Sequence, residues 1–236
     1  QPLASYKGGG AVSAPVLHIV NATFLNCFVS NANDRGGAVV AASLTVTGSQ
    51  FTDCSAGWGG AVVGQWVDLS HTHFTACTAG LYGGAVFGED INTTEVYFDQ
   101  CRSGQLILFS PPDSVAGAVY VYYGKALLRA THFTNCSADY GGALYSAGEV
   151  TGRDLTFTDC WAQDGGALYF DTGPATLGNV TVRNCSARTG SRTPKFLTPP
   201  EPNPTANLTT QIPHATPNSS LRPPPPPHSL PSTLHP

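Results

Sequence analysis

The sequence predicts an all-β protein: a parallel β-helix of about seven coils over residues 1–190, followed by a disordered tail over residues 191–236. Three observations predict this organisation: a tandem repeat, a fixed order of strand-like segments within each repeat, and a change of composition near residue 190. Most copies of the repeat lie 23 to 25 residues apart. A tandem period in this range is typical of solenoids, in which each unit buries its apolar side only against neighbouring units.

Each repeat opens with Gly-Gly-Ala followed by Val or Leu. A pair of glycines suits a tight bend that needs a positive φ or a close approach of two backbones, and the alanine leaves room for the next coil. One degenerate copy of the motif reads Ala116-Gly117-Ala118. The six intact copies begin at Gly9, Gly36, Gly59, Gly83, Gly141 and Gly165.

The second half of each repeat is an aliphatic pair followed by Phe-x-x-Cys. In the first copy the pair is Leu17 and Ile19, and polar residues alternate with apolar ones, as in a strand with one buried face. We expect three strands per coil, at the Gly-Gly-Ala segment, the aliphatic pair and Phe-x-x-Cys, with coils about 4.8 Å apart. Val182 replaces Phe in the last copy. The expected ladder consists of Phe24, Phe51, Phe74, Phe98, Phe133 and Phe157, and of Cys27, Cys54, Cys77, Cys101, Cys136, Cys160 and Cys185.

All seven cysteines belong to this repeat. Their spacing does not match zinc signatures, which pair ligands two to four residues apart. A buried column of small thiols beside the phenylalanines is the favoured interpretation. Disulfides between coils stay open as an alternative, because stacking brings neighbouring Cα atoms within the span of about 4.4–6.8 Å that a disulfide bridges.

The alternation of Gly-Gly-Ala-(Val/Leu) with Phe-x-x-Cys over about residues 8–187 resembles the repeat of the polymorphic outer membrane proteins of chlamydiae, whose relatives occur in long eukaryotic and algal surface proteins. The resemblance implies a right-handed parallel β-helix of the pectin-lyase-like superfamily, exposed on a surface and used in adhesion. The chain departs from the family pattern in one respect: cysteine stands where the family has asparagine in all seven copies.

Composition excludes several classes of function. Charged residues make up only 11% of the chain and the net charge is −4. The sequence therefore has no basic patch of the kind that binds nucleic acid. No apolar run approaches the roughly 20 residues of a membrane-spanning helix, so we expect no membrane insertion by this segment. The chain contains no methionine and starts with no signal-like segment, and we expect it to be part of a larger chain.

One repeat is longer than the others. Cys101 and Cys136 are 35 residues apart, about eleven more than usual, and we expect the excess to lie between Ser103 and Ser114. Insertions in solenoids emerge as loops on one face, often the binding face; a neutral surface loop is the alternative. The residues that we expect to contact a ligand are Tyr97, Tyr120, Tyr122, Tyr123, Leu106 and Phe109.

The sequence assigns no catalytic, metal-binding or cofactor-binding residue. Asp139 and Asp164 precede glycine bends, where aspartate commonly bonds nearby backbone N–H groups; a calcium or catalytic site is the alternative. Only Asp99 and Asp113 lie near the expected loop, whereas β-helix polysaccharide lyases and hydrolases line a groove with several carboxylates. His71, His73 and His132 are expected to face outward, and the coil that carries Tyr97 separates His73 from His132. His71 and His73 could share a face, but two imidazoles make a poor metal site.

Seven Asn-x-(Ser/Thr) sequons predict sites of N-glycosylation, which requires a eukaryotic secretory route. From residue 193 the chain is rich in Pro, Ser, Thr and Asn, and Pro223–Pro227 is an unbroken run. Such a segment forms neither helix nor sheet and tends toward polyproline II, as in a stalk or linker. The sequon asparagines are Asn21, Asn92, Asn135, Asn179, Asn184, Asn207 and Asn218.

These features together predict a non-catalytic β-helix, secreted or on the cell surface (outer membrane or cell wall), that acts as an adhesin or spacer. Its ladder-like face is expected to bind a glycan or a protein surface. Two alternatives stay open: a carbohydrate-active enzyme on the same fold, and a fragment of a larger cell-wall or matrix repeat protein.

Overall fold

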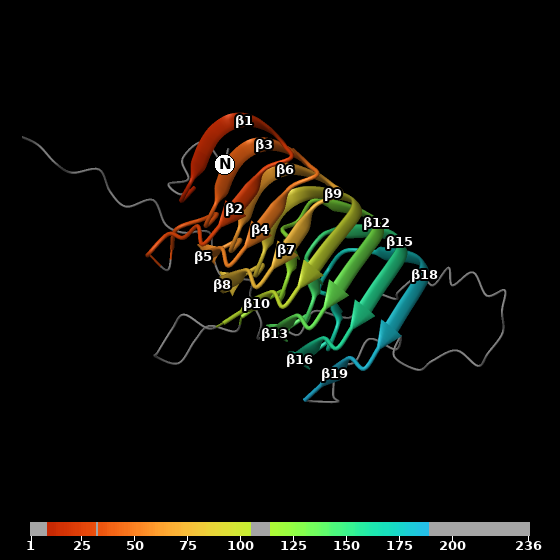
Figure 1. The fold of residues 1–236 in the computed structure, drawn as a ribbon. Helices are drawn as coiled ribbons and strands as arrows, with labels where there is room; N and C mark the ends of the chain where they lie inside the picture. The colour runs from red at the N-terminus through yellow and green to blue at the C-terminus, as the bar shows by residue number, and fades with distance from the viewer. Residues whose placement is uncertain (1–8, 32, 105–113, 189–236) are drawn as a thin grey trace, which may run out of the picture.

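The computed structural model is a stack of parallel strands that winds through about seven coils along one axis (Figure 1). It describes residues 9–31, 33–104 and 114–188. The expected tail, the ligand contacts Leu106 and Phe109, and Asp113 lie outside these residues. The described residues contain strands and no helix, and therefore no helix that could span a membrane.

Two parallel sheets form the sides of the coil. One has thirteen strands, and the other has six strands in the order β19-β16-β13-β10-β8-β5. The strands are β1 (Val12–Val20), β2 (Thr23–Leu25), β3 (Val39–Thr47), β4 (Gln50–Thr52), β5 (Ser55–Trp58), β6 (Val62–Ser70), β7 (His73–Thr75), β8 (Thr78–Tyr82), β9 (Val86–Asp99), β10 (Arg102–Ser103), β11 (Val119–Val121), β12 (Lys125–Thr134), β13 (Ser137–Tyr140), β14 (Leu144–Ser146), β15 (Glu149–Thr158), β16 (Trp161–Asp164), β17 (Leu168–Phe170), β18 (Ala175–Arg183) and β19 (Ser186–Ala187).

The division of each coil into strands differs from the expected one. In the first three coils the Gly-Gly-Ala segment and the aliphatic pair form one continuous strand, as in β1, β3 and β6. A short strand after the cysteine, which the sequence did not predict, builds the six-stranded sheet. The smaller sheet therefore closes each coil on the side opposite the aliphatic run.

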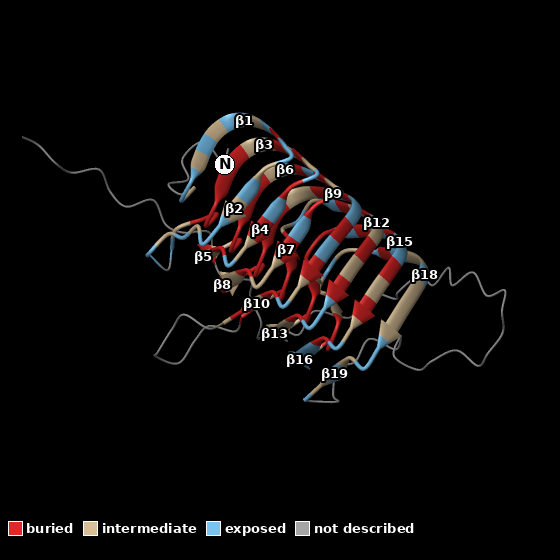
Figure 2. Cartoon of the chain, in the orientation of Figure 1, coloured by how far each residue is buried: buried red, intermediate tan, exposed pale blue. Residues whose placement is uncertain are grey.

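Equivalent residues of successive coils stack in register, as the sequence predicts. The strand after Gly-Gly-Ala aligns Val12, Val39, Val62, Val86 and Val119 in one column. Inside the coil, six phenylalanine rings form a continuous stack with centroids 4.7–5.0 Å apart. Figure 2 shows these inward-facing positions as buried along the stack. The apolar bore of the coil is the hydrophobic core.

Three corners per coil place residues in the left-handed region. The first corner is the first glycine of Gly-Gly-Ala, with φ of 55–63° at Gly36, Gly59, Gly83, Gly141 and Gly165. The second lies before the Phe strand, and the third is the residue before each cysteine. Apart from Gly48, with a φ of 60°, these two corners hold residues other than glycine at φ of 44–57°, an uncommon conformation outside glycine and asparagine. The second corner contains Asn21, His71, Glu95, Ala130, Asp154 and Asn179; the third contains Asn26, Asp53, Ala76, Gln100, Asn135, Asp159 and Asn184.

The long repeat contains two insertions, not one. Ser103 pairs with Ala79 and Val115 pairs with Tyr82, so residues 105–113 have no counterpart in the preceding coil. The remaining excess lies between β11 and β12, where Val121 pairs with Gly88 but Ala126 pairs with Ile91. The expectation that all of the excess lies between Ser103 and Ser114 is therefore wrong, because part of it enlarges the corner at Tyr122 and Tyr123.

Candidate functional site

The cysteine column lies in the bore and is structural. Five of its members are at most 1% exposed, and only Cys27 and Cys185, in the end coils, are half-buried. All seven are free thiols. The Cys77 thiol donates to the carbonyl oxygens of Phe51 and Thr75, both at 3.6 Å, and burial raises the pKa of Cys101. Burial thus favours the protonated Cys101 thiol, which is neither a nucleophile nor a metal ligand.

An aromatic face lies outside the bore, on the opposite side of the strands that follow Gly-Gly-Ala. Tyr120 lies 5.2 Å from Phe87 and from Tyr145, and Tyr145 lies 5.2 Å from Tyr169, measured between ring centroids. The ring planes within each pair are 3–5° apart. We define the aromatic face by Trp58, Tyr82, Phe87, Tyr120, Tyr122, Tyr123, Tyr140, Tyr145 and Tyr169.

Both sheets contribute to the aromatic face. Trp58, Tyr82 and Tyr140 occupy one register column of the smaller sheet, next to the ladder across the glycine corner. Tyr82 packs edge-on against Trp58 with centroids 4.8 Å apart. The corner enlarged by the second insertion adds Tyr122, whose ring lies 5.9 Å from Phe87. Register and insertion thus gather aromatic residues from six coils on one surface.

Exposure differs sharply across the aromatic face. Tyr82 and Tyr120 are 5% exposed, whereas Tyr123 is 51% exposed. Burial raises the pKa of Tyr82 to about 12. Burial, followed by the Asp171 carboxylate, raises the pKa of Tyr145 as well. The phenols therefore stay protonated and can donate hydrogen bonds at neutral pH.

The stacking decides what these rings offer to a ligand. In the ladder, the inner rings of Tyr120 and Tyr145 have both flat faces covered by neighbouring rings, so these faces are not available to a ligand. Tyr123 differs because its plane is 73° from that of Tyr122 at a centroid distance of 4.7 Å. Its exposed ring surface is available for stacking.

A buried cation borders the aromatic face. The Arg35 guanidinium lies 4.4 Å from the centre of the Trp58 ring, and Arg35 is 4% exposed. This cation–π contact fixes the indole at the edge of the face. The Trp58 Nε1–H is buried and has no hydrogen-bond partner among the described residues.

Tyr97 belongs to a different surface. It lies between His73 and His132, with ring centroids 4.6 and 4.7 Å away, and is 42% exposed. This stack lies on the outer side of the Phe strands, in register with β7 and β12. The structure therefore does not bring Tyr97 together with Tyr120, Tyr122 and Tyr123, although the sequence groups all four as ligand contacts.

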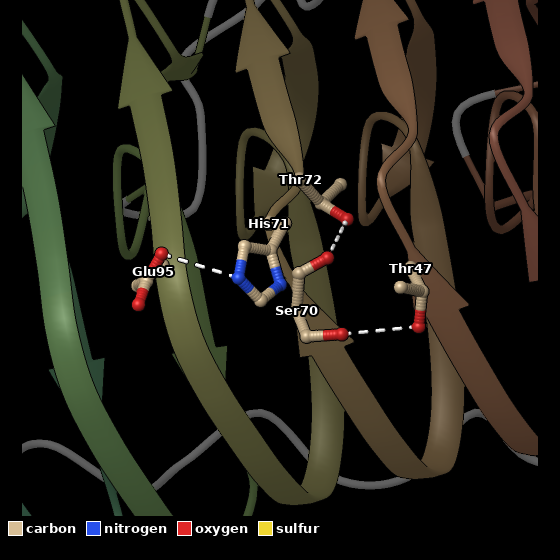
Figure 3. Close-up of polar contacts among 5 residues, drawn as sticks. All are labelled: Thr47, Ser70, His71, Thr72 and Glu95. Atoms are coloured by element: carbon tan, nitrogen blue, oxygen red, sulfur yellow. Dashed lines mark hydrogen bonds and ion pairs between the residues drawn. The ribbon is translucent and has the colours of Figure 1, made fainter.

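The corner before the Phe strand is a ridge of polar contacts between coils (Figure 3). His71 Nε2 lies 3.2 Å from a carboxylate oxygen of Glu95 in the next coil. The hydroxyls of Thr47 and Ser70 are 3.0 Å apart, and the Thr72 hydroxyl donates to the Ser70 carbonyl at 2.8 Å. These contacts connect the coils at this corner, and they give the hydroxyl of the buried Thr72 a hydrogen-bond partner.

Carboxylates in the described residues serve turns and inter-coil contacts. Asp139 accepts hydrogen bonds from the backbone N–H and the hydroxyl of Ser114, and also contacts Gln163. Asp90 accepts from the backbone N–H of Lys125 at 2.8 Å. No group of three or more His, Cys, Asp or Glu side chains in the described part of the chain could hold a metal ion.

The sequon asparagines that the structure describes are all exposed. Asn92 lies on β9, and the other four occupy left-handed corners with φ of 49–52°. None belongs to the aromatic face. Asn207 and Asn218 lie outside the described residues. The described asparagines are Asn21, Asn92, Asn135, Asn179 and Asn184.

No known family model, curated protein or solved structure matches this chain.

Proposed function

We propose that this chain is a non-catalytic β-helix, displayed outside the cell, that binds a glycan through its aromatic face. The observation that carries the proposal is the gathering of nine aromatic side chains outside the bore, in a cluster that is separate from the core of the bore and ends in the exposed ring of Tyr123. The resemblance of the repeat to that of polymorphic outer membrane proteins supports a place on a surface and a role in adhesion.

The chemistry of the aromatic face suits a sugar. Tyrosine combines an apolar ring with a polar tip, so Tyr123 stacks on the C–H face of a sugar while phenol hydroxyls bond its hydroxyl groups. Among the described residues, no group of three or more His, Cys, Asp or Glu side chains gathers at this face, which favours binding over hydrolysis. The exposed sequons lie elsewhere on the coil, so glycans attached there would leave this face open.

The test is binding of purified full-length chain to a panel of soluble plant, algal and animal polysaccharides, measured by titration calorimetry. Tyr123→Ala should weaken binding roughly tenfold or more, as expected for an aromatic anchor. Trp66→Ala is the matched control, because Trp66 is also 51% exposed but lies outside the aromatic face on β6.

Three outcomes would contradict the proposal. One is the absence of binding to every polysaccharide in the panel. Another is equal weakening by Trp66→Ala and Tyr123→Ala, which would indicate nonspecific adsorption. Release of unsaturated or reducing sugars during the titration would instead identify a carbohydrate-active enzyme.

A further inference from the structure

A carboxylate borders the aromatic face. The in-register pairing of β11, β14 and β17 places the residues that follow these strands, Tyr122, Ala147 and Asp171, in one column. The backbone N–H of Ala147 donates to Val121 at 3.0 Å and that of Asp171 donates to Ser146 at 2.9 Å, which continues the parallel pairing. Since Ala147 contributes only a methyl group, no large side chain of this column separates Tyr122 from Asp171.

Asp171 lies close enough to the phenols of the aromatic face to influence their ionisation. Burial is the largest cause of the raised pKa of Tyr120, Tyr123 and Tyr145, and the negative charge of Asp171 contributes to all three. Asp171 is half-buried, whereas Tyr123 is the exposed ring of the face. A ligand that stacks on Tyr123 therefore also meets this carboxylate.

The described residues provide no ion-pair partner for Asp171. The cation at the other end of the face, Arg35, is buried and stacked on Trp58. The ion pairs of the described residues lie elsewhere and include His71–Glu95, Lys125–Glu149 and Arg153–Asp154.

The other carboxylates at the corner after β11 already have partners. Glu89 accepts a hydrogen bond from the Gln65 side chain at 3.2 Å, and Asp90 accepts one from the backbone N–H of Lys125 at 2.8 Å. The Lys125 ammonium lies 3.1 Å from a carboxylate oxygen of Glu149. These contacts stabilise the corner and engage the charges that a ligand would otherwise meet.

A carboxylate without a cation, next to an exposed ring, discriminates between ligands. A neutral sugar stacked on Tyr123 would remove water from Asp171 without replacing the lost interactions. A protonated amine would form a charge-assisted hydrogen bond with the carboxylate, and a cation close to a tyrosine ring gains cation–π attraction. In an amino sugar the ammonium group is attached to the sugar ring, so one unit can stack on Tyr123 and pair with Asp171.

We propose that the glycan bound by the aromatic face carries protonated amino groups, as in a polymer of deacetylated amino sugars, and that Asp171 pairs with one of them beside Tyr123. This inference rests on the proposed function, because it names the ligand class of the same face. Asp171 is thus the residue that determines specificity, and Tyr123 is the ring that holds the sugar.

The test compares two oligosaccharides by titration calorimetry with the purified full-length chain at pH 6. The hexamers of glucosamine and of N-acetylglucosamine share one backbone and differ in whether the nitrogen is charged. We expect wild type to bind the glucosamine hexamer at least about tenfold more tightly. Addition of NaCl to about 0.5 M should remove most of this preference, because salt screens an ion pair at a partly exposed site.

Asp171→Asn is the decisive variant, because it removes the charge and keeps a side chain of the same size. It should weaken binding of the glucosamine hexamer about tenfold and leave binding of the N-acetylglucosamine hexamer unchanged. Asp68→Asn is the matched control, since Asp68 is exposed on β6 outside the aromatic face. It changes the net charge equally and should bind both hexamers like wild type.

Several results would overturn the inference and leave the proposed function standing. These are equal affinity of wild type for the two hexamers, equal weakening by the two asparagine variants, and binding of another polysaccharide of the panel when neither hexamer binds. Hexalysine binding as tightly as the glucosamine hexamer would also overturn it, because charge alone would then suffice. Absence of binding to every glycan would overturn both proposals. If Asp171→Asn fails to fold by circular dichroism, the salt-sensitive preference of wild type between the two hexamers supplies the test.

Discussion

The carboxylate of Asp139 accepts two hydrogen bonds from Ser114, one from the backbone N–H at 2.9 Å and one from the hydroxyl at 2.8 Å. The Ser114 hydroxyl also lies 3.0 Å from the backbone N–H of Asp139 and accepts from it. Ser114 is the residue at which the chain rejoins the coil after residues 105–113. This reciprocal contact fixes the point of re-entry.

Asp139→Ala should therefore destabilise the coil. The substitution leaves the buried N–H of Ser114, which is 2% exposed, without its acceptor, and such a loss costs about 1–3 kcal/mol. Urea unfolding followed by circular dichroism measures the change. Asp68→Ala is the control, since Asp68 is exposed on β6, and it should change the free energy of unfolding by less than about 0.5 kcal/mol. Equal effects of the two substitutions would contradict this role of Asp139.

Thiol labelling should separate the seven cysteines into two groups. Cys27 and Cys185 are half-buried at the ends of the stack, and the other five are buried. A small thiol reagent at pH 8 should modify at most these two in the native chain and all seven in denaturant. Mass spectrometry of the labelled chain identifies the positions. Rapid native labelling of Cys77 or Cys101 would show that the bore is open.

The stability of the coil should fall at alkaline pH. Burial raises the pKa of Tyr82 from 10.0 to about 12, so the folded state keeps a phenol proton that the unfolded state loses. This contribution is fully present below pH 10 and is lost as the pH rises from 10 to 12, by at most about 1.4 kcal/mol per pH unit. Burial raises the pKa of Tyr120 as well, which acts in the same direction. Urea unfolding at pH 8, 10 and 11 tests this, and Tyr82→Phe should flatten the profile.

The columns of the bore could be predicted from the sequence because register stacking requires the same residue type at the same place in every coil. The strand after each cysteine could not be predicted from the sequence. Segments such as Ser137–Tyr140 are short, and their one small inward-facing residue gives no clear β pattern. Their strand conformation comes from pairing with neighbouring coils, not from local propensity.

The aromatic face was found only in part, and alignment explains why. Counting back from cysteine spreads Phe87, Tyr120, Tyr145 and Tyr169 over three columns, at 14, 16, 15 and 16 residues before it, because the corner before the aliphatic pair varies in length. Counting forward from Gly-Gly-Ala places all four two residues after the alanine. The sequence singled out only Tyr120 in this column, together with Tyr122 and Tyr123.

Ala76 offers a stabilising substitution. It adopts a φ of 53° at the corner before Cys77, where other coils have Asn26, Asp53 or Asn135. Alanine is strained in this conformation, whereas asparagine tolerates it. Ala76→Asn should raise the free energy of unfolding by about 0.5–1 kcal/mol and the melting temperature by a few degrees. Thermal unfolding measures both, and a lower melting temperature would contradict the assignment of strain to this corner.

The glycine corners should be the least tolerant positions of the fold. A Cβ added to Gly84 would lie 2.0 Å from the carbonyl oxygen of Gly117 in the next coil and 2.5 Å from that of Arg102. Both contacts are with backbone, which cannot move without separating the coils, so Gly84→Ala should lower the free energy of unfolding by about 3 kcal/mol or more.

Gly178 in β18 is the matched control, because a Cβ there meets nothing within 4 Å. Gly178→Ala should leave stability unchanged or raise it slightly, since alanine lowers the entropy of the unfolded chain. Urea unfolding of the two variants gives the comparison, and a Gly84→Ala chain as stable as wild type would mean that the coils do not approach as closely as this corner requires.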